Sequence, residues 1–177
     1  RSLNDPTIIN FSVFDIIIKT FLTSKVVCLV IIYLRLNRCF AISTLPIYNF
    51  VIIDNRDGSI SLSNQQIAFL CDRRFGVGAD GLMLMSMANG YDFSMTYYNA
   101  DGTEGTMCGN GARCLVQFAH DNGIVKENYT FIAIDGPHEA SIHNSGWVHL
   151  KMTDVKSVET GADFFVTDTG SPHYVKM

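Results

Sequence analysis

The chain has 177 residues, of which 47% are hydrophobic and 17% charged, and this composition excludes a disordered tail. Thirteen Lys and Arg against 17 Asp and Glu give a net charge of −4, which argues against nucleic acid or an anionic membrane as the main partner. Five cysteines without regular spacing do not indicate a secreted disulfide framework, so we expect free thiols in a reducing, cytoplasmic setting.

The composition changes near residue 40. Residues 1–40 contain no Gly or Ala, and 20 of them are Ile, Leu, Val or Phe, whereas all 14 glycines lie after residue 40. The longest apolar run there, residues 26–34, is far shorter than the roughly 20 residues of a membrane-spanning helix. Neither strand alternation nor a helical stripe organises this segment. We expect an extension that is not native to the fold behind it or, alternatively, a poorly patterned pair of buried strands.

From residue 41 onward, many short strands and two helices are predicted. The sequence from Ser63 to Gln66 has the S-x-x-Q form of a capping box that begins the first helix. The second helix is expected over residues 111–122, because apolar residues there recur at helical spacing, and Gly123 suits the position after its end. The predicted strands cover residues 48–53, 81–86, 93–98, 129–134, 139–142 and 147–152. This order of elements indicates an α+β fold.

Two glycine-rich segments stand out. Residues 74–81 contain G-x-G but lack the third glycine of a dinucleotide fingerprint, so we interpret them as a tight turn that packs closely on a neighbour. In the second segment, Cys108 lies just before the predicted helix, where backbone N–H groups and the helix dipole favour a thiolate and a bound anion. Gly109 and Gly111 lack side chains, so a small ligand could reach these N–H groups.

The alternative for Cys108 is a small buried residue, the usual fate of cysteine, and we expect that fate for Cys71 and Cys114. A metal site of Cys108, Cys114 and His120 does not match zinc spacing. For several further residues we expect a structural role and no function. Met83, Met85 and Met87 are predicted to form one face of a core strand, and Tyr97 and Tyr98 to pack within a strand. The histidines expected to be solvated or in loops are His120, His138, His143 and His149.

Residues 74–81, 98–102 and 107–114 resemble signatures in the N-terminal half of diaminopimelate epimerases, and residues 170–175 resemble that family's Gly-Asn/Ser-Pro-His segment. The resemblance implies two similar α+β domains, each a set of strands wrapped around a central helix, with the active site between them. The expected division is an extension over 1–40, an N-terminal domain over 41–135 and an incomplete second copy over 136–177.

The resemblance also implies the chemistry, which is the interconversion of LL- and meso-diaminopimelate for lysine biosynthesis without pyridoxal phosphate or metal. Cys108 would be one of two catalytic cysteines, and His173 would support catalysis. The residues that would hold the substrate are Asn99, Gly109, Asn110 and Ser171. The partner is a small amino acid rather than nucleic acid or membrane, and a homodimer of the intact family member is left open.

This chain departs from the family pattern in several places. The second catalytic cysteine and a Glu-Arg pair are expected beyond Met177, so we expect no epimerisation by the two-thiol route from this chain as given. The family's Gly-Asn-Asp-Phe contact is replaced by Ile-Tyr-Asn-Phe at residues 47–50, and Gly81 stands where some members have Gln.

Other functions remain open at this point. A non-catalytic remnant or carboxylate-binding module would keep the fold without the reaction. Phenazine-biosynthesis-type isomerases and proline racemase-like enzymes are disfavoured because their motifs differ. A cysteine hydrolase would need a histidine base, and His173 is the only histidine in a recognisable motif.

Overall fold

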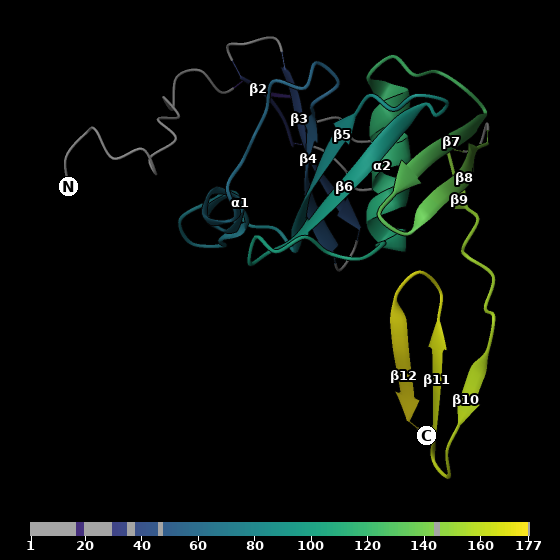
Figure 1. Cartoon of the computed structure of the whole chain (residues 1–177). Coiled ribbons are helices and arrows are strands. Elements are labelled where there is room, and N and C mark those ends of the chain that lie inside the picture. The colour runs from purple at the N-terminus through teal and green to yellow at the C-terminus, as the bar shows by residue number, and fades with distance from the viewer. Residues whose placement is uncertain (1–16, 20–29, 35–37, 46–47, 144–145, 177) are drawn as a thin grey trace.

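The computed structural model describes residues 17–19, 30–34, 38–45, 48–143 and 146–176. Within these residues, nine strands form one sheet in chain order, and three strands form a separate sheet (Figure 1). The first sheet contains β1 (Ile17–Lys19), β2 (Val30–Leu34), β3 (Arg38–Leu45), β4 (Tyr48–Asp54), β5 (Gly81–Ser86), β6 (Phe93–Asn99), β7 (Asn128–Ala133), β8 (Gly136–Ile142) and β9 (Val148–Leu150). The second contains β10 (Val158–Thr160), β11 (Phe164–Asp168) and β12 (Pro172–Lys176).

Two neighbouring pairs in the large sheet are parallel, namely β4 with β5 and β6 with β7, and each is joined through a helix. The first crossover contains α1 (Asn64–Cys71) and the second contains α2 (Gly109–Asp121). A crossover is required because parallel strands cannot be joined by a tight hairpin. The other described pairs are antiparallel.

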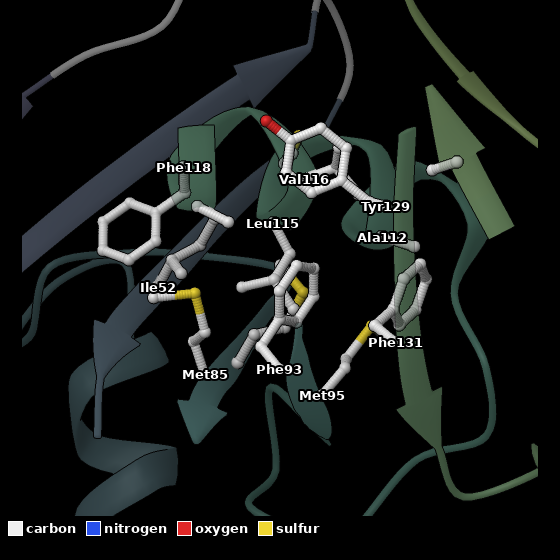
Figure 2. Packing of buried hydrophobic residues seen from close by; sticks show 14 of the residues in the cluster. Ile52, Met85, Phe93, Met95, Ala112, Leu115, Val116, Phe118, Tyr129 and Phe131 are labelled. Carbon is white, nitrogen blue, oxygen red and sulfur yellow. The ribbon is translucent and has the colours of Figure 1, made fainter. Parts of the chain in front are cut away.

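The two helices cover opposite faces of the sheet, and strand alternation assigns each residue to one of them. Along β4, Phe50 and Ile52 belong to the core around α2, whereas Val51 and Ile53 pack in the core around α1. Figure 2 shows Leu115 of α2 among buried side chains from several strands. Because α2 also contacts β3, β8 and β9, the sheet wraps around it. The predicted α+β fold with strands around a central helix is confirmed.

Helix boundaries follow the local sequence closely. The capping box forms as predicted: the Gln66 backbone N–H donates to Ser63 Oγ at 3.3 Å, and the Ser63 N–H donates to Gln66 Oε1 at 2.9 Å. Helix α2 begins two residues earlier than predicted, because Cys108 already serves as its N-cap. Gly123 follows its end with a φ of +97°, a left-handed conformation that favours glycine.

The tight turn predicted over residues 74–81 is present. The backbone N–H groups of Val77 and Gly78 both donate to the Leu70 carbonyl, at 2.9 and 3.2 Å, so the chain folds back onto the end of α1. Cys71 and Cys114 are buried, as expected, in the cores on either side of the sheet.

Two predictions about single residues are wrong. His138 is 6% exposed and stacks on Phe131, because β8 begins three residues before the predicted strand and its alternation turns His138 inward. Met83 and Met85 are fully buried, but Met87 lies beyond the end of β5 and is exposed.

The expected domain boundary at residue 135 falls in the turn between β7 and β8, and these two strands pair in the large sheet. The separate small sheet begins at Val158. Of residues 1–40, the structure describes the backbone of β1, β2 and the start of β3. In the sheet, β1 pairs with β2, β2 with β3, and β3 with β4. The rest of the expected extension lies outside the described residues. In the described part of the chain, no helix is both long and apolar enough to span a bilayer.

Candidate functional site

The site is built around the first turn of α2. Cys108 is the N-cap residue, with extended backbone angles, and its Sγ accepts a hydrogen bond from the Gly111 N–H at 3.4 Å. Its carbonyl accepts the first helical bond, from Ala112, at 2.8 Å. No described residue accepts a hydrogen bond from the N–H of Gly109 or Asn110, as is usual for the first turn of a helix. A half-buried thiol and two available N–H groups therefore lie side by side.

The two glycines of this turn have different surroundings. A Cβ on Gly109 would make ordinary van der Waals contacts with Met152 and Leu150, at 3.4 Å or more, so a methyl group would fit at this position. A Cβ on Gly111 would lie 2.9 Å from Met83 Sδ, inside the core. The expectation that both glycines open the backbone to a ligand is wrong for Gly111, which packs on Met83. For Gly109, which lines the pocket described below, it stays a prediction.

The turn between β11 and β12 packs against the start of α2. Ser171 Oγ donates to the Met107 carbonyl at 2.9 Å, and Thr106 Oγ1 lies 2.7 Å from Ser171 Oγ. Because the single hydroxyl hydrogen of Ser171 is used on Met107, Thr106 is the donor in the second bond. In the same turn, Thr169 Oγ1 lies 2.9 Å from His173 Nε2. The turn and the beginning of β12 therefore bring two predicted site residues, Ser171 and His173, close to the start of α2.

A pocket of about 420 Å³ lies between the α2 start and this turn. Its lining combines a thiol, three aliphatic hydroxyl groups, an amide, an imidazole, a guanidinium and a phenol with the sulfur-containing side chains of two methionines. The lining residues are Tyr97, Thr106, Met107, Cys108, Gly109, Asn110, Arg113, Met152, Thr169, Ser171 and His173.

The lining includes every predicted site residue except Asn99, namely Cys108, Gly109, Asn110, Ser171 and His173. Asn99 ends β6 and is exposed, and its side-chain amide donates to Thr103 Oγ1 at 3.2 Å within its own turn. Of residues 47–50, Ile47 lies outside the described residues. The roles assigned to these residues by resemblance remain predictions.

Sequence reasoning missed Tyr97 and Arg113. Arg113 donates to Asn110 Oδ1 and so holds that amide in the pocket wall. Its place in the cysteine motif, three residues after Asn110 on the same helix, was an available signal. Tyr97 follows Phe93 and Met95 at strand alternation, which predicts packing, but near the end of β6 this face of the strand reaches the pocket.

The pocket combines groups suited to an amino acid. Backbone N–H groups at a helix start bind carboxylates, and a thiol at the same place can exchange a proton with the adjacent carbon. Burial raises the pKa of Tyr97 to about 12, and the nearby Cys108, Asp80 and Cys71 add to that rise, so the phenol stays protonated and can only donate or accept as a neutral group. The arrangement therefore fits proton transfer at a carbon next to a carboxylate.

The family model for diaminopimelate epimerase matches residues 48–158. A diaminopimelate epimerase from Flavobacterium psychrophilum is 48% identical over 130 residues, which cover 73% of this chain and 51% of that protein. The enzyme of the same name from Chlorobaculum tepidum is 43% identical over 134 residues, covering 72% of this chain and 52% of that one. The chain spans about half the length of the curated relatives it matches.

Among solved structures, a PhzF-family phenazine biosynthesis protein from Bacillus anthracis superposes with a TM-score of 0.56 at 14% identity, over 78% of this chain and 54% of that one. This likeness concerns the fold alone. The match of the family model extends over more than half of the sequence and includes Cys108 and the first turn of α2. By that match, the chain belongs to the diaminopimelate epimerase family.

Proposed function

We propose that this chain forms the N-terminal part of a diaminopimelate epimerase, an isomerase of lysine biosynthesis that interconverts LL- and meso-diaminopimelate without a cofactor. Cys108 is one of its two proton-transfer thiols. The second domain begins with β10 rather than at residue 136, because β8 and β9 complete the first sheet. The cytoplasm is the proposed location.

The proposed reaction moves protons between two sulfur atoms and one carbon. The Cys108 thiolate takes the α-proton from one face and becomes a thiol, while the bond electrons pass into the substrate carboxylate. The second thiol, expected outside this chain, gives its proton to the opposite face and becomes a thiolate, so protons and charge balance. The growing charge on the carboxylate is stabilised by the N–H groups of Gly109 and Asn110 at the start of α2.

The observation that supports this proposal is the position of Cys108. Its sulfur caps a thirteen-residue helix, is half-buried, and lines one pocket with Ser171 and His173, which come from more than 60 positions further along the chain. A structural cysteine would be enclosed like Cys71 and Cys114, which are 3% and 5% exposed. The three described free cysteines therefore provide an internal comparison.

The test is alkylation of the 177-residue chain with iodoacetamide, followed by mass spectrometry of each cysteine peptide. We expect Cys108 to react before Cys71 and Cys114, and meso-diaminopimelate to slow its reaction in a saturable manner. The Cys108→Ser variant supplies the control for the assignment of the peptide. Equal, slow labelling of all three cysteines, without protection, would contradict the proposal.

A carboxylate-binding module of the same fold gives a different result in the same experiment. Calorimetric binding of diaminopimelate that is unaltered in Cys108→Ser, together with an unreactive Cys108, would favour the module. A racemisation assay of the chain as given is expected to show no turnover. Turnover that Cys108→Ser abolishes would refute the need for a thiol outside this chain.

A further inference from the structure

The phenol of Tyr97 occupies a place in the pocket that two glycines leave open. A Cβ on Gly81 would lie 2.5 Å from Tyr97 Cε2 and 2.8 Å from its hydroxyl oxygen. On the other side, a Cβ on Gly105 would lie 2.6 Å from Tyr97 Cδ1. Any larger residue at position 81 or 105 would displace the ring, so the ring packs directly against the backbone of two glycines.

One further contact packs on this ring, and one bond fixes the backbone beside it. Phe50 meets the ring edge to face, with ring centroids 6.2 Å apart, and the backbone carbonyl of Tyr97 accepts the Gly105 N–H at 2.8 Å. A ring that packs closely on Gly81, Gly105 and Phe50 has little rotamer freedom left before a ligand arrives. A polar group so placed binds a ligand without a further entropy cost.

The hydroxyl of Tyr97 differs from that of Tyr129 in its possible hydrogen-bond partners. Among the described residues, none accepts a hydrogen bond from it, whereas the buried Tyr129 hydroxyl donates to the Ile124 carbonyl at 2.8 Å. Tyr97 is half-buried, and no buried side-chain nitrogen or oxygen of the described residues lacks a partner, so the Tyr97 hydroxyl is open to the pocket rather than enclosed. Tyr97 lines the same pocket as Cys108, and its raised pKa keeps the proton on the oxygen. The pocket thus contains a fixed, unused hydrogen-bond donor.

Resting on the proposed function, we propose that Tyr97 is a substrate-binding residue whose hydroxyl donates a hydrogen bond to the carboxylate of the amino acid held at the start of α2. The Cys108 sulfur is a weaker candidate acceptor, because it already accepts the Gly111 N–H. The Arg113 side chain is directed to Asn110, so the phenol adds to the backbone N–H groups a donor from another element. A carboxylate has two oxygens and can accept from both sides.

The test uses the full chain and the concentration of meso-diaminopimelate that halves the rate of Cys108 alkylation. Tyr97→Phe keeps the ring between Gly81 and Gly105 and removes only the hydroxyl. Loss of one hydrogen bond to a charged group should raise the half-protecting concentration about 10- to 100-fold. The alkylation rate without ligand should stay within about twofold of the original.

Tyr98→Phe is the matched control. Tyr98 is the next residue of β6 and faces the other core, so loss of its hydroxyl should leave protection unchanged. In a second measurement, ultraviolet difference spectroscopy on addition of diaminopimelate should give a tyrosine signal that Tyr98→Phe retains and Tyr97→Phe lacks. Thermal unfolding of each variant checks that the fold is kept.

The outcomes separate the two proposals. If diaminopimelate protects the original chain and Tyr97→Phe equally, the role of Tyr97 is wrong and the proposed function stands. If Tyr97→Phe changes only the alkylation rate of the free protein, the phenol affects the reactivity of the Cys108 thiol, and the proposed contact with the carboxylate is wrong. If the original chain shows no protection, the proposed function fails and the inference falls with it.

Discussion

The Ser171 hydroxyl donates a hydrogen bond to the Met107 carbonyl at 2.9 Å and so joins residues that are 64 positions apart. The Met107 carbonyl immediately precedes the capping cysteine of α2, so the bond attaches the small sheet at the point where the pocket opens. The same hydroxyl oxygen receives a bond from Thr106. Hydrogen bonds therefore join the segment before α2 to the turn between β11 and β12 at one place.

Ser171→Ala is expected to loosen this junction. One partly buried hydrogen bond contributes about 1 kcal/mol, so amide hydrogens of β11 and β12 should exchange about fivefold faster in the variant. Hydrogen-exchange mass spectrometry of residues 164–176 measures this. Ser59→Ala is the control, because the Ser59 hydroxyl bonds only Asp57 in an exposed turn. Unchanged exchange in Ser171→Ala would mean that the bond does not hold the small sheet.

Gly170→Ala should disturb the same turn for a steric reason. Gly170 has a φ of +98°, and a Cβ there would lie 2.5 Å from Asp135 Oδ2, whose carboxylate is already bonded to His138. Gly123, with a φ of +97° and open space around it, is a matched control for the backbone strain. We expect Gly170→Ala to cost at least about 1 kcal/mol more than Gly123→Ala in urea unfolding monitored by exchange. Equal effects would exclude the contact with Asp135.

Two alanine substitutions in the first turn of α2 should separate packing from ligand binding. Gly111→Ala places a Cβ 2.9 Å from Met83 Sδ, and overpacking should cost about 1–2 kcal/mol despite the better helix propensity of alanine. Gly109→Ala meets Met152 at 3.4 Å, so stability should change by less than about 0.5 kcal/mol while protection of Cys108 by diaminopimelate weakens. Urea unfolding and alkylation measure the two effects. The reverse pattern would contradict the assignment of Gly111 to the core.

Stability should fall at alkaline pH because of Cys71. Burial first, and the nearby Asp80 second, raise the pKa of Cys71 from 9.0 to about 11. The unfolded chain therefore loses this proton at lower pH than the folded one, so the stabilising effect is complete below pH 9 and is lost as the pH rises through about 11. The loss is on the order of 2 kcal/mol. Thermal unfolding between pH 8 and about 11 should show a smaller decline in Cys71→Ala; an equal decline would assign it to other groups.

Local sequence patterns predicted the helices and strands well where the stabilising contacts join residues that are close along the chain. The capping box at Ser63 and the buried face of α2 follow from spacings of three and four residues, which lie within one helical turn. The prediction for His138 is wrong because β8 extends back through it, and the start of β8 depends on pairing with β7. The prediction for Gly111 is wrong because its neighbour Met83 lies on β5, which is distant along the chain.

The sequence alone determined that a cysteine begins a helix next to a glycine, because capping and backbone exposure are properties of adjacent residues. It also determined which residues belong together as a family signature. Only the tertiary structure decided that Ser171 and His173 lie at that cysteine, that Asn99 does not line the pocket, and that the Tyr97 phenol fills the space beside Gly81. Those relations join segments that are distant along the chain, and such distances are set by how the sheet curls around α2 and where the small sheet attaches.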